Sequence, residues 1–90
     1  MQEFKKLIYD CWNDRNEGRH AWMAYGDYWI TIEPVEADGE DLLEVCLSTD
    51  VDMLGYPYGD CIRMDSVYAE GLDDEFLNGV YKYITTGEEY

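Results

Sequence analysis

The chain has few basic residues. Its 6 Lys and Arg stand against 21 Asp and Glu, which gives a formal net charge of -15 over 90 residues. A surface this negative repels the phosphates of nucleic acid and of anionic lipids, so it argues against direct binding to either. The chain also lacks an apolar run near the ~20 residues of a transmembrane helix, and it lacks the apolar stretch of a secretory signal. We therefore expect a cytoplasmic protein that contacts neither nucleic acid nor membranes directly.

Cysteine is scarce too. Cys11, Cys46 and Cys61 cannot all pair within one chain, and their spacing matches neither a CxxC pair nor a zinc motif. We expect three buried free thiols and no metal site.

The acidic segment from 50 to 61 is the remaining metal candidate. Asp50, Asp52 and Gly55 occupy positions 1, 3 and 6 of a calcium loop, but Leu54 and Cys61 stand where the loop needs an oxygen ligand and a glutamate. We interpret this segment as a turn-rich acidic loop that holds no cofactor.

Apolar residues are abundant. The chain is 47% hydrophobic and 16% aromatic, a composition that argues against disorder and for one folded domain spanning residues 1–90. In the first segment Phe4, Leu7, Ile8, Cys11 and Trp12 recur at helical spacing. This stripe predicts an amphipathic helix over residues 2–16.

After this helix the apolar period changes from helical to alternating. Gly26-Asp27 and Asp38-Gly39 are two-residue turn signals between alternating runs, the pattern of antiparallel hairpins. Counting outward from both turns gives one apolar face that can receive the helix: Ala21, Met23, Ile30, Ile32, Leu43, Val45 and Leu47.

The rest of the chain contains turn formers and one more helical pattern. We expect residues 49–65 to form a long irregular connection, residues 62–69 a fourth, edge strand and residues 73–87 a second helix. The predicted fold class is α+β, with an N-terminal amphipathic helix packed on a three- to four-stranded antiparallel β-meander and a C-terminal helix.

The opposite face of the predicted sheet is mixed in character. By the same register it carries His20, Trp22, Ala24, Trp29, Thr31, Glu33, Glu44 and Cys46. Glu33 then lies opposite Glu44, and Glu36 lies opposite Asp41, although like charges across a strand pair cost stability. Selection for stability alone would avoid these pairs, which suggests that the carboxylates serve a function.

No catalytic signature accompanies these residues. His20 is the only histidine, faces Glu33 across the first hairpin and shares its face with Cys46, but no oxyanion donors are evident beside them. Phosphate-binding glycine loops, metalloprotease helices and nucleophile elbows are absent as well. We therefore interpret His20 and Glu33 as an ion pair and predict that the protein is not an enzyme.

The two tryptophans of this face allow two interpretations. Either the second helix covers Trp22 and Trp29 as another core layer, or the rings remain exposed among acids as anchors for a basic partner. Tyr56 and Tyr58 can serve as anchors in the same way.

The charge itself is concentrated. Residues 1–19 hold four basic and four acidic residues, so residues 20–90, with 2 basic and 17 acidic residues, carry the whole net charge. Duplex DNA carries one charge per ~1.7 Å of its axis, so fifteen charges correspond to about 25 Å of duplex. In size and charge, though in no motif, the chain is similar to the small acidic inhibitors that phages and mobile elements use against restriction enzymes and CRISPR nucleases.

This similarity implies a non-enzymatic inhibitor that replaces nucleic acid on a basic nucleic-acid-binding protein such as a nuclease. The predicted partner-binding carboxylates are Glu33, Glu36, Asp38, Glu40, Asp41, Glu44, Asp50, Asp52 and Asp60, and the predicted aromatic contacts are Trp22, Trp29, Tyr56 and Tyr58. The alternatives are an immunity or antitoxin-like protein that neutralises one toxin through its aromatic residues, and an accessory protein-protein interaction module.

Overall fold

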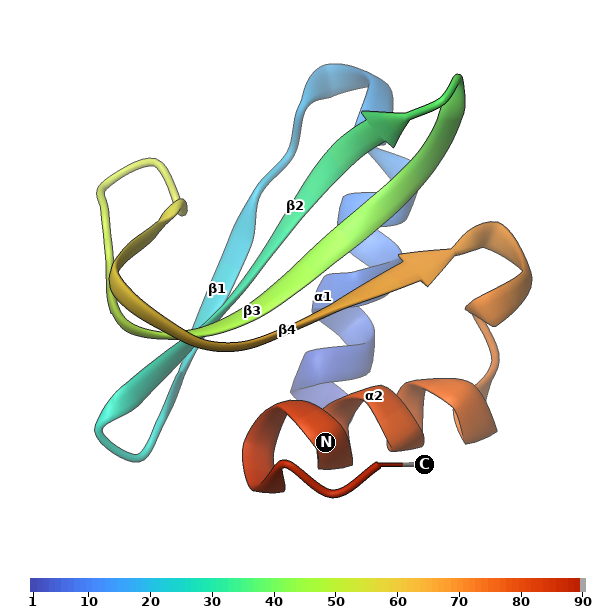
Figure 1. The fold of residues 1–90 in the computed structure, drawn as a ribbon. Coiled ribbons are helices and arrows are strands. Elements are labelled where there is room, and N and C mark those ends of the chain that lie inside the picture. The colour runs from blue at the N-terminus through green and yellow to red at the C-terminus, as the bar shows by residue number, and fades with distance from the viewer. Residues whose placement is uncertain (90) are drawn as a thin grey trace.

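A four-stranded antiparallel sheet forms the centre of the computed structural model, which describes residues 1–89 (Figure 1). Its strands, in the order β1-β2-β3-β4, are β1 (Ala21–Tyr25), β2 (Tyr28–Ala37), β3 (Glu40–Val51) and β4 (Pro57–Tyr68). Two helices, α1 (Gln2–Asn13) and α2 (Asp74–Thr86), complete the fold. The α+β class and the β-meander are those predicted from the sequence.

Two tight turns set the register of the first three strands. Gly26 has φ 58°, while Asp38 and Gly39 have φ 54° and 78°, the left-handed conformations that two-residue hairpin turns require. The pairing is the one counted from the sequence: Ala21 lies opposite Ile32, and Ile32 lies opposite Val45.

Both helices pack on the same face of the sheet; in Figure 1, α1 lies behind the strands and α2 lies below them. The apolar stripe of α1 buries Phe4, Ile8 and Cys11, whereas α2 buries an equivalent stripe of its own. The predicted first helix was too long: α1 ends at Asn13, and residues 15–17 form the 3₁₀ turn η1 before Gly18 ends the segment in a left-handed conformation. One core therefore lies between helices and sheet, built from Phe4, Ile8, Cys11, Ala21, Ile30, Ile32, Leu43, Val45, Leu47, Val67, Leu77, Val80 and Ile84.

The predicted irregular connection over residues 49–65 was wrong. β3 continues to Val51 and β4 begins at Pro57, so the connection is only the loop between them. The turn formers in this stretch are accommodated by two irregularities in the β3–β4 register, one of which includes Gly59 at φ 80°. Pro57 costs no central hydrogen bond because it is the first residue of an edge strand.

The start of α2 supports a first test. The Asp73 carboxylate accepts a hydrogen bond from the Phe76 N–H at 2.8 Å and so caps the helix. We expect Asp73→Ala to lower the free energy of unfolding by about 1 kcal/mol, measured by urea denaturation. Asp73→Asn removes the same charge but keeps a capping oxygen, so its free energy of unfolding should fall clearly less than that of Asp73→Ala. Equal losses in the two variants would contradict the capping role.

Candidate functional site

The face of the sheet away from the helices, here called the open face, carries carboxylates along its central strands. Glu33 and Glu44 lie opposite each other on β2 and β3 as predicted. Alternation along β3 places Glu40 and Asp50 on the same face as Glu44, near the two ends of that strand. Carboxylates therefore follow β3 over about 30 Å of strand length.

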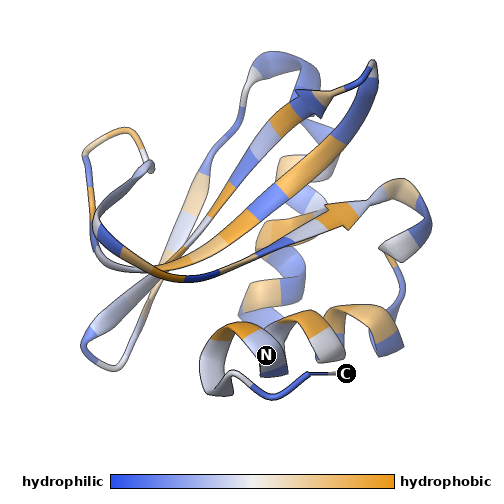
Figure 2. Cartoon of the chain, in the orientation of Figure 1, coloured by the Kyte–Doolittle hydropathy of each residue, from blue (hydrophilic) through white to orange (hydrophobic). Residues whose placement is uncertain are grey.

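More carboxylates lie on the β2–β3 hairpin and on the segment that follows β4. β4 ends at Tyr68 opposite Leu42, so the 3₁₀ turn η2 (Ala69–Gly71) follows near the end of the sheet that carries the hairpin turn, and α2 begins farther along the same side of the molecule (Figure 1). Figure 2 shows the hairpin turn in hydrophilic colours. We define the acidic end as Glu36, Asp38, Glu40, Asp41, Glu70, Asp73, Asp74 and Glu75.

Only two basic side chains have a described ion pair within the acidic end. Arg15 Nε lies 3.1 Å from Asp41 Oδ2, and Lys5 Nζ lies 3.3 Å from Asp74 Oδ1. The Arg15 contact offsets the like-charge pair of Glu36 and Asp41 that the register predicted. The acidic end therefore keeps most of its negative charge.

The other basic residues have partners elsewhere in the described part of the chain. Lys6 and Arg19 pair with acids of α1 and its C-cap, and Lys82 pairs with Glu88. Arg63 donates to the Ile84 carbonyl at the end of α2. Lys6 also holds the pKa of the Asp10 carboxyl below its ordinary value through their hydrogen bond.

The structure divides the predicted carboxylate array into two groups. Six members lie on the β2–β3 hairpin, at the acidic end or next to it: Glu33, Glu36, Asp38, Glu40, Asp41 and Glu44. Asp50, Asp52 and Asp60 lie at the other end of β3 and in the β3–β4 hairpin. Asp50 and Asp52 also accept backbone hydrogen bonds there, Asp50 from the Val51 N–H at 2.8 Å.

Sequence reasoning missed the contribution of η2 and α2 to the acidic end. The predicted carboxylate array did not include Glu70, Asp73, Asp74 or Glu75. The signal that could have found them was the predicted edge strand, because an antiparallel fourth strand must end beside the β2–β3 hairpin.

Neither helix covers the tryptophans, so the second core layer considered above does not form. Trp22 remains 41% exposed and Trp29 is half-buried. The β3–β4 loop, which curls over β1 in Figure 1, contacts Trp22 instead. Of the other predicted aromatic contacts, Tyr58 is 65% exposed, and the Tyr56 ring packs against His20 in a tilted arrangement with ring centroids 4.4 Å apart.

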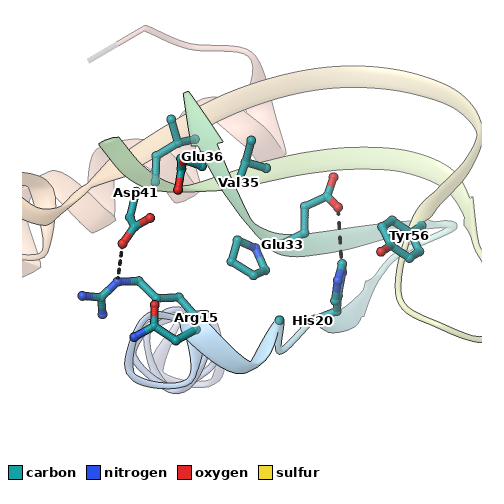
Figure 3. A pocket seen from close by; sticks show the side chains of 11 residues that line it. Arg15, His20, Glu33, Val35, Glu36, Asp41 and Tyr56 are labelled. Carbon is teal, nitrogen blue, oxygen red and sulfur yellow. Dashed lines mark hydrogen bonds and ion pairs between the residues drawn. The ribbon is translucent and has the colours of Figure 1, made fainter. Parts of the chain in front are cut away.

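A groove of about 340 Å³ opens beside the part of β2 that extends past β1 (Figure 3). Arg15 and Asp41 lie on one side of it and His20, Glu33 and Tyr56 on the other. Backbone N–H positions along β2 face β3 and the opposite side alternately. Counting from the Asp38-Gly39 turn places the Pro34 nitrogen on the side away from β3, where no strand pairs with it. Proline, which has no N–H, therefore removes no hydrogen bond from the sheet at this position. The groove thus joins the acidic end to the open face.

The predicted pairing of His20 and Glu33 is present. His20 Nδ1 lies 3.8 Å from Glu33 Oε2 and has no hydrogen-bond partner within residues 1–89. Burial raises the pKa of the Glu33 carboxyl above its ordinary value, and Glu44 adds to the rise while His20 opposes it. Glu33 is therefore a destabilised carboxylate at neutral pH.

This raised pKa gives a pH-dependent prediction. A carboxyl whose pKa is higher in the folded than in the unfolded state destabilises the fold fully above its folded-state pKa. This destabilisation disappears as the pH falls toward the ordinary pKa of the carboxyl. We expect Glu33→Gln to raise the free energy of unfolding by about 0.5 kcal/mol at pH 8 and to change it little at pH 4, measured by urea denaturation. The gain at pH 8 should exceed that of Glu89→Gln, an exposed control with the same charge change. A loss of stability at pH 8 would mean that the His20 contact outweighs burial and Glu44.

The cysteines are free, as predicted, but they are not all buried. Cys11 and Cys46 are buried, whereas Cys61 is exposed on β4. Burial, reinforced by a contact with Cys61, raises the pKa of the Cys46 thiol to about 12. This thiol stays protonated at neutral pH and is not an activated nucleophile.

Comparison of this chain with protein-family models, with curated proteins and with solved structures finds no match. No helix within residues 1–89 has the length and apolar character needed to cross a membrane.

Proposed function

We propose that the chain is a small acidic inhibitor, not an enzyme, that binds a basic nucleic-acid-binding protein such as a nuclease. The observation that carries this proposal is the acidic end, where carboxylates of the β2–β3 hairpin and of the η2–α2 segment lie along one side of the molecule (Figure 1) and only Arg15 and Lys5 have a described ion pair with them. The carboxylates take the place of phosphates in the partner's binding groove.

The dimensions of the molecule support this reading. Its extents are 32 × 30 × 24 Å. The net charge of -15 corresponds to about 25 Å of duplex, so the protein offers a nucleic-acid groove a similar charge over a similar length. Such a surface accelerates association with a basic partner, and added salt weakens the complex. A restriction enzyme or a CRISPR nuclease is the kind of partner that we propose.

The second candidate function is an immunity or antitoxin-like protein that neutralises one specific toxin. The exposed aromatic residues Trp22, Tyr56 and Tyr58 favour it, since rings of this type anchor apolar interfaces. A complex of that kind holds through high salt, whereas a complex formed by charge does not.

Capture of partners on the immobilised protein distinguishes the two candidate functions. Proteins from an extract of the source cells are bound, eluted with a salt gradient, and bound again in the presence of competing duplex DNA. We expect a nucleic-acid-binding protein that elutes at moderate salt and that DNA displaces. A partner that remains through 1 M salt and ignores DNA would overturn the proposal in favour of the antitoxin-like function.

A further inference from the structure

The β3–β4 loop exposes two adjacent apolar side chains. Met53 is 95% exposed and Leu54 is 70% exposed, more than any other large apolar side chain within residues 1–89. Figure 2 shows the loop as a hydrophobic segment set apart from the core. We call Met53 and Leu54 the apolar knob.

The loop that carries the apolar knob is closed by its own hydrogen bonds. Asp52 Oδ1 accepts from the N–H groups of Leu54 and Tyr56, both at 2.9 Å. The Asp52 N–H donates to the Tyr56 carbonyl at 3.0 Å, and the Gly55 N–H donates to the Asp52 carbonyl at 3.2 Å. Four hydrogen bonds therefore fix the backbone on both sides of the knob.

The same loop is also docked on the body of the protein. Gly55 is buried with φ 90°, and a Cβ built on it would lie 2.6 Å from Trp22 Cε3, so the loop backbone rests directly on the indole ring. Beside it the Tyr56 ring packs on His20. Trp22 thus acts as a platform that holds the loop, while the side chains of the knob lie in solvent.

This combination suggests a binding anchor. Isolated exposed apolar residues are common on protein surfaces and need no explanation. Here, however, two of them are adjacent, almost fully exposed and held by an ordered loop, so little conformational freedom remains to be lost when they are buried by a partner. Methionine and leucine also fill irregular apolar pockets readily.

The surrounding charge selects the partner. Asp50, Asp52 and Asp60 flank the knob, and the whole chain carries a net charge of -15. A second copy of the chain and an anionic lipid surface would both be repelled. We propose that Met53 and Leu54 anchor the chain in an apolar pocket rimmed by Lys or Arg on its protein partner. This inference rests on the proposed function, because the basic protein bound by the acidic end is the partner that provides the pocket.

The test uses the full chain and the partner purified by capture on it. We expect Met53→Ser/Leu54→Ser to weaken binding at least about 30-fold, measured by titration calorimetry, without changing the slope of affinity against salt. Tyr28→Ser, which removes exposed ring area on the first hairpin, should bind like the parent chain. Thermal unfolding should be unchanged in the double variant because both side chains lie in solvent.

A second readout observes the anchor directly. With ¹³C-labelled methionine methyl groups, the Met53 signal should shift when the partner is added, while that of half-buried Met23 should not. Parental affinity of the double variant together with an unmoved Met53 signal would overturn the inference and leave the proposed function intact. A parental complex that ignores both salt and DNA would instead overturn the proposed function, and with it the basic rim of the pocket.

Discussion

Neutralising four carboxylates of the acidic end is expected to weaken binding to the proposed basic partner about 100-fold. The variant combines Glu36→Gln, Asp38→Asn, Glu40→Gln and Glu70→Gln; all four side chains are exposed and have no described ion pair. Exposed charge contacts contribute about 0.7 kcal/mol each, and four of them account for the hundredfold loss. Because the lost contacts are ionic, affinity should also depend less steeply on salt.

A matched variant separates the position of the charge from its amount. Glu3→Gln, Glu17→Gln, Asp27→Asn and Glu89→Gln also remove four negative charges, from exposed positions outside the acidic end and away from the apolar knob. This control should lose less than about threefold in affinity, measured by the same calorimetric titration. Equal losses in both variants would mean that only total charge matters and that the acidic end is not the contact surface.

Replacing Leu43 by alanine lowers the free energy of unfolding by about 3 kcal/mol. Leu43 is fully buried at the centre of the sheet, between Pro34 and Val67 and beneath the helices. Removing a buried leucine side chain costs about 2–5 kcal/mol through lost burial and the cavity left behind. A chain of this size has a total stability of about 5–13 kcal/mol, so the variant loses between about a quarter and about three fifths of it.

Leu54→Ala is the matched control for this variant. It makes the same chemical change in the apolar knob, where Leu54 is 70% exposed, and should leave the urea midpoint unchanged. Similar losses for Leu43→Ala and Leu54→Ala would contradict the assignment of one side chain to the core and the other to a binding loop.

Local signals in the sequence were sufficient for the first half of the fold. Helical spacing from Phe4 to Trp12 and two-residue turns with left-handed residues at Gly26, Asp38 and Gly39 defined a helix and a register that the structure confirms. Because a tight hairpin leaves no freedom in its register, opposing pairs such as Glu33 and Glu44 follow directly from it.

Features that depend on long-range packing were harder to predict from the sequence. The turn formers around Asp50 and Gly59 indicated a loop, yet pairing with β3 extends β4 through them by means of bulges. Helical spacing in α2 also does not specify which face of the sheet the helix covers. For this reason the exposure of Trp22, and its contact with Gly55, emerged only from the structure.

In the candidate site, too, local features were predicted from the sequence and long-range features were not. The hairpin carboxylates were predicted because they are adjacent in sequence and register, whereas the position of Glu70 depends on where β4 ends beside β3. The apolar knob was missed for a related reason. Met53 and Leu54 sit among turn formers, and only the closed loop reveals that both side chains point into solvent.

Competition with nucleic acid tests the central claim most directly. Labelled duplex DNA is bound to the captured partner, and its fluorescence anisotropy is followed as the chain is added at several DNA concentrations. We expect the chain to displace the DNA fully, so that the apparent Kd for DNA rises in proportion to the concentration of the chain. No complex should contain the partner, the DNA and the chain together. A stable ternary complex, with DNA affinity unchanged at saturating chain, would contradict the claim that these carboxylates occupy a nucleic-acid groove.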